Sequence, residues 1–263
     1  MRSWFAHDEL DVLLAEDEGE LVGYGDRLRE GTSSRVFLDV QVRPGDAGTG
    51  EALLRELEAR AVRDAPADAY AMTWVAQFDM TMRDVVTTVG FELVRHSFQM
   101  ATSLDDVDPP QWADGIEVRP YDPGHEALVH AAQQEAFADH WEHEDASLEE
   151  WRRWFVEAPS FDPSFWFVAW DGEEVAGISL CRVDASEDPQ HGHVRVLAVR
   201  RPWRRRGLGT ALLLHSFLDM KRRGMTKASL GVDAENTTGA VRLYERADMV
   251  VERRYDVYRK ELL

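Results

Sequence analysis

The chain has 263 residues and is poor in cysteine and in long apolar runs: Cys181 is the single cysteine, and no stretch approaches the ~18 apolar residues of a membrane span. A single cysteine excludes an intrachain disulfide, which is typical of proteins in a reducing compartment. Residues 1–14 lack a basic segment followed by an apolar one, so we expect no secretion signal. These absences predict a cytoplasmic protein that does not act on a membrane.

Basic residues are also scarce, with 30 Lys and Arg against 49 Asp and Glu and a formal net charge of −19. Nucleic acids and anionic lipid surfaces bind to net basic faces, so we expect neither as a partner. The acidity either keeps the protein soluble or suits a cationic substrate, and composition leaves both readings open. The chain is long enough for one large domain or two ordinary ones.

Acidic residues, two prolines and a glycine interrupt the pattern around residues 104–115. Such a composition favours a linker, which we place at 107–114. It separates an N-terminal domain over 1–106 from a C-terminal domain over 115–263. The same order of predicted elements occurs on both sides, which indicates an internal repeat.

The C-terminal half is the more complete copy. Its apolar periodicity predicts strands over 115–121, 193–199, 227–233 and 249–262, a hairpin over 164–183 turned at Asp171-Gly172, and helices over 124–141, 147–158, 207–224 and 237–247. The N-terminal half repeats the later part of this order, with a hairpin over 10–27 turned at Glu18-Gly19 and further elements over 34–42, 48–64, 69–79, 81–90 and 91–104. The opening strand and two helices have no counterpart there. We therefore expect an α/β fold of two tandem copies, each a mixed sheet flanked by helices, with the N-terminal copy incomplete.

Five arginines fall within residues 200–206, directly after the predicted strand 193–199, and Gly207 and Gly209 follow at the start of a helix. The first N–H groups of a helix have no intrahelical partner, and with the helix dipole they form an anion site. Glycines allow a phosphate to approach the backbone, and arginines add bidentate donors. This loop is therefore predicted to bind a diphosphate.

The spacing narrows the choice of diphosphate. The P-loop pattern GxxxxGK[ST] is missing, and the dinucleotide pattern GxGxxG fails because Leu212 stands at its third small residue. The pattern Arg204-x-x-Gly207-x-Gly209 resembles the acetyl-CoA loop of the GNAT N-acetyltransferases, and the surrounding order of elements resembles a tandem arrangement of that fold. The resemblance implies acetyl-CoA as cosubstrate.

The same resemblance implies a set of cofactor-binding residues. In this family the strand before the loop parts from its neighbour, and the pantetheine arm lies in the gap. The residues expected to hold the cofactor are Leu197, Ala198, Val199, Arg204, Arg205, Arg206, Gly207, Leu208, Gly209, Thr210 and Asn236.

Two residues are candidates for catalysis. Tyr244 matches the family's tyrosine that protonates the departing thiolate, although an aromatic residue on a helix face is also a normal core residue. His193 stands where many members have a glutamate base. A histidine can accept the proton of an ammonium directly or through water, so His193 is expected to be the base or a substrate contact, unless it is only an exposed strand end.

In this family the connection between the first two helices often lines the acceptor cleft. Here it spans 139–151, and Trp141, Glu142 and Glu144 could offer an aromatic wall and anionic partners to a cationic amine. The His140/His143 spacing is too weak a signal for a metal site, so none is expected. A solvated acidic face remains the other interpretation of this segment.

The N-terminal copy departs from the pattern at the decisive positions. Gly48 and Gly50 match Gly207 and Gly209, but Asp46 precedes them, no arginine lies near them, and Val86 stands where Tyr244 stands. A carboxylate at that place repels a phosphate. We expect this copy to be a structural partner that walls the acceptor cleft.

The resemblance as a whole implies an acyltransferase that moves acetyl from acetyl-CoA to a primary amine of a small molecule, by direct attack in a ternary complex. Cys181 lies on a hairpin strand away from the loop, which argues against an acyl-cysteine intermediate. A cysteinyl amino-sugar inositol competes as acceptor with an antibiotic, a polyamine, an amino acid or a peptide amine. The alternative is a non-catalytic sensor or scaffold that binds acetyl-CoA. A monomer or a homodimer is expected.

Overall fold

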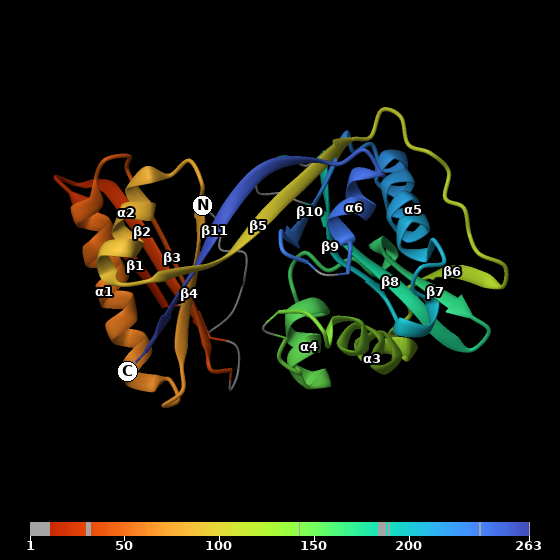
Figure 1. Cartoon of the computed structure of the whole chain (residues 1–263), viewed down its shortest axis with the longest axis horizontal. Coiled ribbons are helices and arrows are strands. Elements are labelled where there is room, and N and C mark those ends of the chain that lie inside the picture. The colour runs from red at the N-terminus through yellow and green to blue at the C-terminus, as the bar shows by residue number, and fades with distance from the viewer. Residues whose placement is uncertain are drawn as a thin grey trace. The chain divides into compact units, whose positions relative to one another are not determined.

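The computed structural model describes residues 11–29, 33–141, 143–183, 188, 190–236 and 238–262. By its internal contacts the chain divides into two compact units (Figure 1). Of the described residues, those of unit 1 lie within 99–232 and 236–252, and those of unit 2 lie within 11–98, 233–235 and 253–262. Each unit is described by itself below.

Unit 1 contains the second copy of the repeat. Its strands are β6 (Ile116–Pro120), β7 (Trp166–Asp171), β8 (Glu174–Val183), β9 (His191–Val199) and β10 (Lys227–Asp233), joined by parts of β5 (Glu92–Ser103) and β11 (Val250–Glu261). Its helices are α3 (Glu126–Phe137), α4 (Leu148–Phe155), α5 (Leu208–Arg222) and α6 (Ala240–Glu245), with short 3₁₀ turns η1 (Pro123–His125), η2 (Pro163–Phe165) and η3 (Arg201–Trp203). The strand order is β5-β10-β9-β8-β7-β6.

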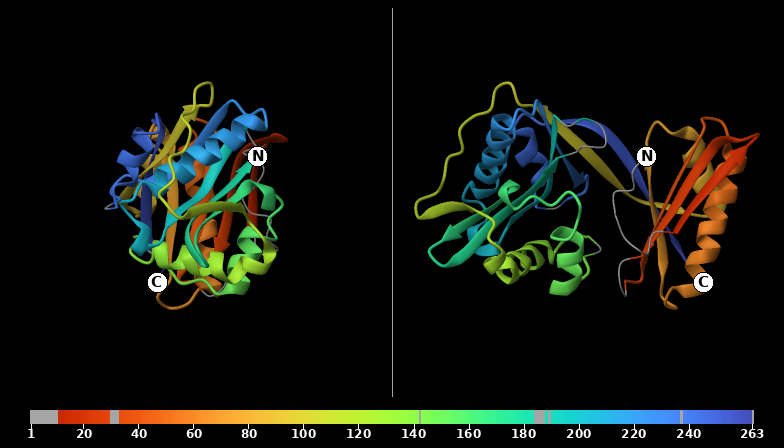
Figure 2. Two further views of the ribbon diagram at one scale, coloured as in Figure 1. Left: turned by 90° about the vertical axis from the view of Figure 1, so that its right-hand side faces the viewer. Right: turned by 180° about the vertical axis from the view of Figure 1, so that it is seen from behind.

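Helices cover both faces of this sheet (Figures 1 and 2). Ile178 packs in a cluster with Val129 of α3 and Trp151 of α4, whereas a Cβ on the preceding Gly177 would lie 3.0 Å from Leu212 of α5. Because successive residues of a strand point to opposite faces, α3 and α4 cover one face and α5 covers the other. The central strands are buried on both sides, which explains their nearly continuous apolar sequence.

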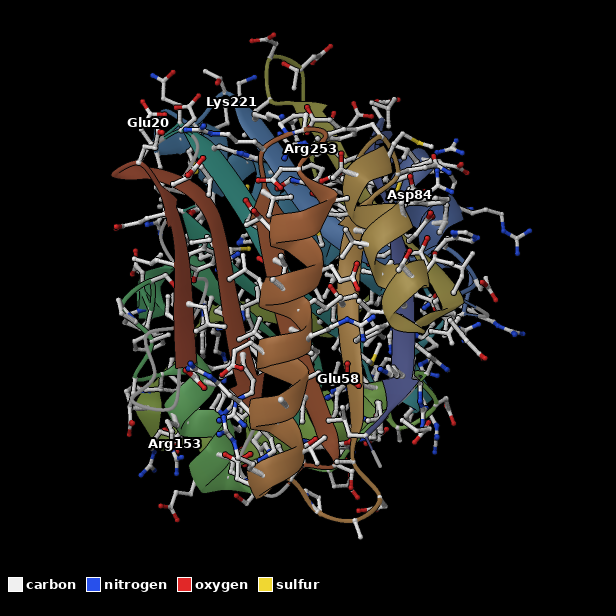
Figure 3. All side chains as sticks on the ribbon, turned by 90° about the vertical axis from the view of Figure 1, so that its left-hand side faces the viewer. Glu20, Glu58, Asp84, Arg153, Lys221 and Arg253 are labelled. Atoms are coloured by element: carbon white, nitrogen blue, oxygen red, sulfur yellow. The ribbon has the colours of Figure 1, made fainter. Side chains whose placement is uncertain are left out.

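Unit 2 contains the first copy. Its elements are β1 (Asp11–Asp17), β2 (Glu20–Arg29), β3 (Arg35–Val42), α1 (Ala47–Asp64), β4 (Tyr70–Ala76) and α2 (Met80–Val89), with the remaining parts of β5 and β11. The strands follow the order β1-β2-β3-β4-β11-β5. Figure 3 shows α1, which carries Glu58, beside α2, which carries Asp84, on one face of this sheet. Apolar residues of both helices and of β3 form the core under them.

Local signals explain several element boundaries. Ser147 caps α4: its Oγ accepts the N–H of Glu150, and the Glu150 carboxylate accepts the N–H of Ser147. The turn between β1 and β2 is formed by Glu18 and Gly19, both at positive φ, as predicted. The second hairpin differs by one residue from the prediction. Asp171 pairs with Glu174, so its loop is Gly172-Glu173 rather than Asp171-Gly172.

The two copies share a hydrogen bond after their last helix as well as the order of their elements. Met249 N–H donates to Tyr244 O at 3.1 Å after α6, and Phe91 N–H donates to Val86 O at 2.9 Å after α2. The residue before each donor has a left-handed backbone, with φ of 57° at Asp248 and 94° at Gly90. Val86 is therefore the structural counterpart of Tyr244.

The units do not follow the predicted boundaries of 1–106 and 115–263. Unit 1 already begins at residue 99, within β5, and residues 253–262 belong to unit 2, where β11 pairs antiparallel with β4 from Tyr255 to Glu261. Most of β11, the last strand of the chain, thus belongs to the sheet of the first copy. Within the described residues, no helix is both long and apolar enough to cross a membrane.

Candidate active site

The site begins where β9 and β10 part. Only three parallel register pairs join these strands, the last being His193 with Ser229, although both strands continue beyond it. On its other edge β9 stays paired with β8 as far as Val199. The end of β9 is therefore bordered on one side by a gap in the ladder, as predicted for the residues that would hold the pantetheine arm.

The backbone of β9 is arranged to serve this gap. The register skips Arg195, so β9 carries a bulge there, and a bulge re-aims the residues beside it. Further along, Arg200 N–H donates to Ala176 O. Since alternate residues of an antiparallel strand bond to the partner, the backbone groups of Leu197 and Val199 point away from β8, whereas those of Ala198 point toward it.

The loop after β9 leads directly into the start of α5. Arg205 has a φ of 61° and Gly207 a φ of 80°, both in the left-handed region. Gly207 is the N-cap residue, no side chain caps the helix, and its first turn holds no acidic residue. The N–H groups of Leu208, Gly209 and Thr210 precede the first bond of the helix, which Ala211 donates to Gly207 O. They form the unsatisfied N-terminal turn that an anion needs.

The arginines of this loop divide into two groups. The Arg204 guanidinium donates to Val199 O at 3.1 Å and to Ala136 O at 2.8 Å, so its side chain holds the loop rather than facing a ligand. Arg205 and Arg206 are exposed, and neither forms an ion pair with any residue that the structure describes. The backbone N–H of Arg204 donates to Arg201 O at 3.3 Å, so the contacts of Arg204 support the loop itself and its predicted role in phosphate binding is an indirect one.

The loop has room for a phosphate at its glycines. A Cβ at Gly207 would meet no atom within 4 Å, so open space lies beside the uncapped turn. At Gly209 a Cβ would lie 2.9 Å from the side-chain end of Leu243 on α6, so this glycine allows α6 to pack closely against α5. The residues present thus fit a diphosphate, with Gly207 shaping the cradle and Gly209 bringing the helices together.

His193 lies at the point where the strands separate. Its Nδ1 is 2.9 Å from Oγ of Ser229, which is fully buried. If Nδ1 carries the proton and donates to Oγ, the ring keeps a lone pair on Nε2, the atom through which an imidazole acts as a base. The β8 register places Arg182 directly across from it.

Tyr244 lies on α6 and is 8% exposed. Burial raises the pKa of its phenol to about 12, so the hydroxyl keeps its proton at any physiological pH. Burial also raises the pKa of the Cys181 thiol to about 11. Since a thiolate is the reactive form, Cys181 is unsuited to carry an acyl group, as the sequence indicated.

Asn236 is used within its own loop. Its Oδ1 accepts the N–H of Thr238 at 2.8 Å and the Thr238 hydroxyl at 2.5 Å, and these bonds shape the approach to α6. Its predicted contact with the cofactor is limited to the atoms that these bonds do not use.

The predicted acceptor segment follows α3. Trp141 is partly buried, Glu144 is exposed, and Glu142 lies outside the described residues. The His143 imidazole contacts the Asp145 carboxylate at 3.2 Å and the His140 imidazole contacts Trp141 O at 3.1 Å, while the backbone N–H of His143 donates to His140 O. No group of metal-binding side chains occurs among the residues that the structure describes.

Comparison with known proteins agrees with this geometry. The family model described as "Acetyltransferase (GNAT) family" matches residues 126–249. A mycothiol acetyltransferase of Streptomyces scabiei is 32% identical over 95% of this chain and 79% of its own length, and one of Geodermatophilus obscurus is 32% identical over 90% and 78%. This chain belongs to the GNAT acetyltransferase family.

Solved structures carry the same fold over nearly the whole chain. A GCN5-related N-acetyltransferase from Sphaerobacter thermophilus has a TM-score of 0.78 and 30% identity, covering 93% of this chain and 78% of its own. A tandem GNAT protein from the clavulanic acid biosynthesis pathway has a TM-score of 0.76 at 15% identity, covering 98% and 85%, and so shares the fold. The predicted tandem GNAT fold and the predicted acetyltransferase activity are confirmed.

In the first GNAT copy the equivalent positions are occupied by the protein's own side chains. The Asp46 carboxylate accepts the N–H of Thr49 at 3.1 Å and so occupies the N-terminus of α1. Its β3 and β4 also share three parallel pairs, but the last of them joins Phe37 to Met72, where the second copy has His193 and Ser229. An apolar pair and a capped helix replace the features that the second copy presents.

The sequence-based prediction missed two parts of the candidate site, namely Ser229 and the carboxylates of Glu135 and Asp139. Ser229 gave no signal because a buried serine in a strand resembles any small core residue. The acidic residues Glu135 and Asp139, which contact the arginine loop, did leave a signal. Carboxylates near the C-terminal end of a helix are unfavourable for its dipole, which indicates that they have cationic partners elsewhere.

Proposed function

We propose that the second copy transfers the acetyl group of acetyl-CoA to a primary amine of a small molecule, by direct attack in a ternary complex. The parting of β9 and β10 after His193, followed at once by the uncapped start of α5, carries this proposal. The backbone of Leu197 and Val199 would hold the pantetheine arm. The N–H groups of residues 208–210 and the side chains of Arg205 and Arg206 would hold the diphosphate.

His193 is the proposed base. An ammonium has no lone pair, so a proton must leave the acceptor before its nitrogen attacks the thioester carbonyl. With Nδ1 bonded to Ser229, His193 would accept that proton at Nε2, directly or through water. Such proton transfer contributes about 10²–10⁴-fold to the rate.

Tyr244 is proposed to act on the leaving sulfur. Its raised pKa of about 12 keeps the phenol protonated, and lies above the range of about 8–9 for a thiol. The hydroxyl would therefore stabilise the departing thiolate by donating a hydrogen bond while the C–S bond breaks. The ammonium loses two protons in all: His193 takes the first before the attack, and the second, released from the nitrogen as the C–S bond breaks, ends on the thiolate to give free CoA thiol, so the reaction balances without a further reactant.

The acceptor is proposed from the named relatives, which are mycothiol acetyltransferases. A cysteinyl amino-sugar inositol is accordingly the first acceptor to test, beside antibiotic, polyamine, amino acid and peptide amines. Release of free CoA thiol is measured for each amine with the purified protein. Turnover with at least one amine supports the proposal. Tight acetyl-CoA binding with no turnover on any amine contradicts it and favours a sensor or scaffold.

A further inference from the structure

The arginine loop is tied to α3 by Glu135. Its carboxylate lies 2.5 Å from Arg200 Nε and accepts the backbone N–H of Arg201 at 3.2 Å. Burial acts to raise the pKa of this carboxyl, but the hydrogen bonds from Arg200 and Arg201 prevail and lower it. Glu135 therefore stays ionised and contacts both the side chain and the backbone at the beginning of the loop.

Asp139, one turn further along, contacts the middle of the loop. Its two oxygens lie 2.7 and 3.2 Å from the Arg201 guanidinium, and one of them is 3.7 Å from Arg204. The hydrogen bond from Arg201 lowers the pKa of Asp139, so this group is also charged. Asp139 is the first residue of the segment 139–151, which is proposed to line the acceptor cleft.

Electrostatics alone disfavours the positions of the Glu135 and Asp139 carboxylates. They lie at the C-terminal end of α3, where the helix dipole disfavours negative charge. They also contact the loop that is proposed to receive a diphosphate, and like charges repel. Their placement therefore implies a gain that outweighs both costs, namely a fixed conformation of the loop.

The loop conformation that Glu135 and Asp139 hold includes an unfavourable backbone at Arg205. Arg205 adopts a left-handed backbone although it has a side chain, and such a conformation persists only where the surroundings determine it. Arg200 and Arg201 are held by the carboxylates just before it, and Arg204 is held by Val199 O and Ala136 O. These contacts hold the loop on both β9 and α3, and leave Arg205 and Arg206 directed to solvent.

We infer that Glu135 and Asp139 are positioning residues for the cofactor: they hold the arginine loop in the shape that presents Arg205, Arg206 and the start of α5 to the diphosphate. The inference rests on the proposed function. It assigns three of the five arginines to holding the loop and two to the ligand.

The direction in which one substitution changes the affinity for CoA tests this inference. Asp139→Asn removes a negative charge near the anion site, so electrostatics alone predicts tighter binding of CoA. Loss of loop positioning predicts weaker binding of CoA, by about tenfold. Affinity for CoA is measured by titration calorimetry on the full chain, together with Glu135→Gln, for which we expect the same direction. Asp219→Asn is the matched control, because Asp219 pairs with Arg223 at the far end of α5.

Limited trypsin digestion gives a second readout that needs no ligand. A released loop is cleaved after Arg205 or Arg206 about tenfold faster in Asp139→Asn than in the wild type, since proteolysis follows the population of open states. Mass spectrometry identifies the cleaved bond, and Asp219→Asn should cleave there at the wild-type rate. Melting temperatures show whether each variant is folded.

The outcomes separate this inference from the proposed function. If wild type binds CoA and Asp139→Asn binds it equally or more tightly, the positioning role is wrong and the proposed function stands. If wild type does not bind CoA, the proposed function fails. Unchanged cleavage after Arg205 and Arg206 in both variants overturns the positioning role whatever the calorimetry shows.

Discussion

His193 Nδ1 lies 2.9 Å from Ser229 Oγ, at the last pair that joins β9 to β10. The hydroxyl orients the imidazole at the point where the two strands part. Ser229→Ala is expected to lower kcat about fivefold, the equivalent of a hydrogen bond of about 1 kcal/mol, and to leave KM for acetyl-CoA unchanged. Ser216→Ala is the control, because Ser216 is equally buried but bonds to Ser179. Equal loss of kcat in both variants would remove Ser229 from the orientation of His193.

Tyr244→Phe tests the proposed role of the phenol at the leaving sulfur. The substitution removes only the hydroxyl, so kcat should fall by about 10²-fold while CoA affinity changes little. Tyr121→Phe is a matched control, since Tyr121 is also buried in unit 1 and burial likewise raises its pKa to about 12. Steady-state kinetics and calorimetry on both variants provide the comparison. Wild-type turnover in Tyr244→Phe would exclude the tyrosine from the reaction.

Gly207 and Gly48 occupy matching positions before α5 and within the start of α1, but only Gly207 has a positive φ, of 80°. Gly207→Ala forces a side chain into the left-handed region, at a cost of about 1–2 kcal/mol, and places a methyl group at the phosphate cradle. CoA affinity should fall at least about tenfold, as measured by calorimetry. Gly48→Ala should leave affinity unchanged. Retained affinity in Gly207→Ala would mean that this turn does not hold the diphosphate.

The Asp46 cap on α1 predicts the stoichiometry of cofactor binding. The carboxylate already accepts the Thr49 N–H, so the first copy should not bind CoA, and calorimetry should give one site per chain. Asp46→Ala should lower the melting temperature through loss of the cap and leave the single site intact. Two sites per chain in the wild type would show that the first copy retains a cofactor site.

The sequence was most informative where one local pattern determined the structure. Alternating residues placed β10 at its observed bounds, and a turn signal placed the loop at Glu18-Gly19. The glycine pair and the arginines located the cofactor loop and led to the GNAT family. The spacing of Ser147 and Glu150, which form a capping box at the start of α4, is a local signal of the same kind.

The sequence was least informative where partners are distant in the chain. The guanidinium of Arg204 is turned to Val199 O and Ala136 O by the 3₁₀ turn before it, and no pattern in one sequence reveals that direction. The pairing of β11 with β4 joins residues at opposite ends of the chain, so a reading that treats each copy as continuous assigns β11 to the second copy. The catalytic roles of His193 and Tyr244 stay predictions.

Asp26 and Asp39 face each other across β2 and β3 in unit 2. Burial and the neighbouring charge of Asp26 raise the pKa of Asp39 from its usual value of 3.8 to about 6. The folded state thus holds this proton more tightly than the unfolded chain does. The resulting stability is fully present below about pH 4 and is lost as the pH rises through about 6.

Asp39→Asn removes this penalty because an amide is not charged at any of these pH values. The variant should be more stable than wild type by about 1–3 kcal/mol at pH 7.5, and the difference should shrink toward zero near pH 4. Denaturant unfolding of both proteins at the two pH values measures it. Asp84→Asn, at an exposed carboxylate on α2 (Figure 3), is the control and should show no such dependence. An equal gain for Asp39→Asn at both pH values would trace its effect to packing, since only the ionised form of Asp39 is repelled by Asp26.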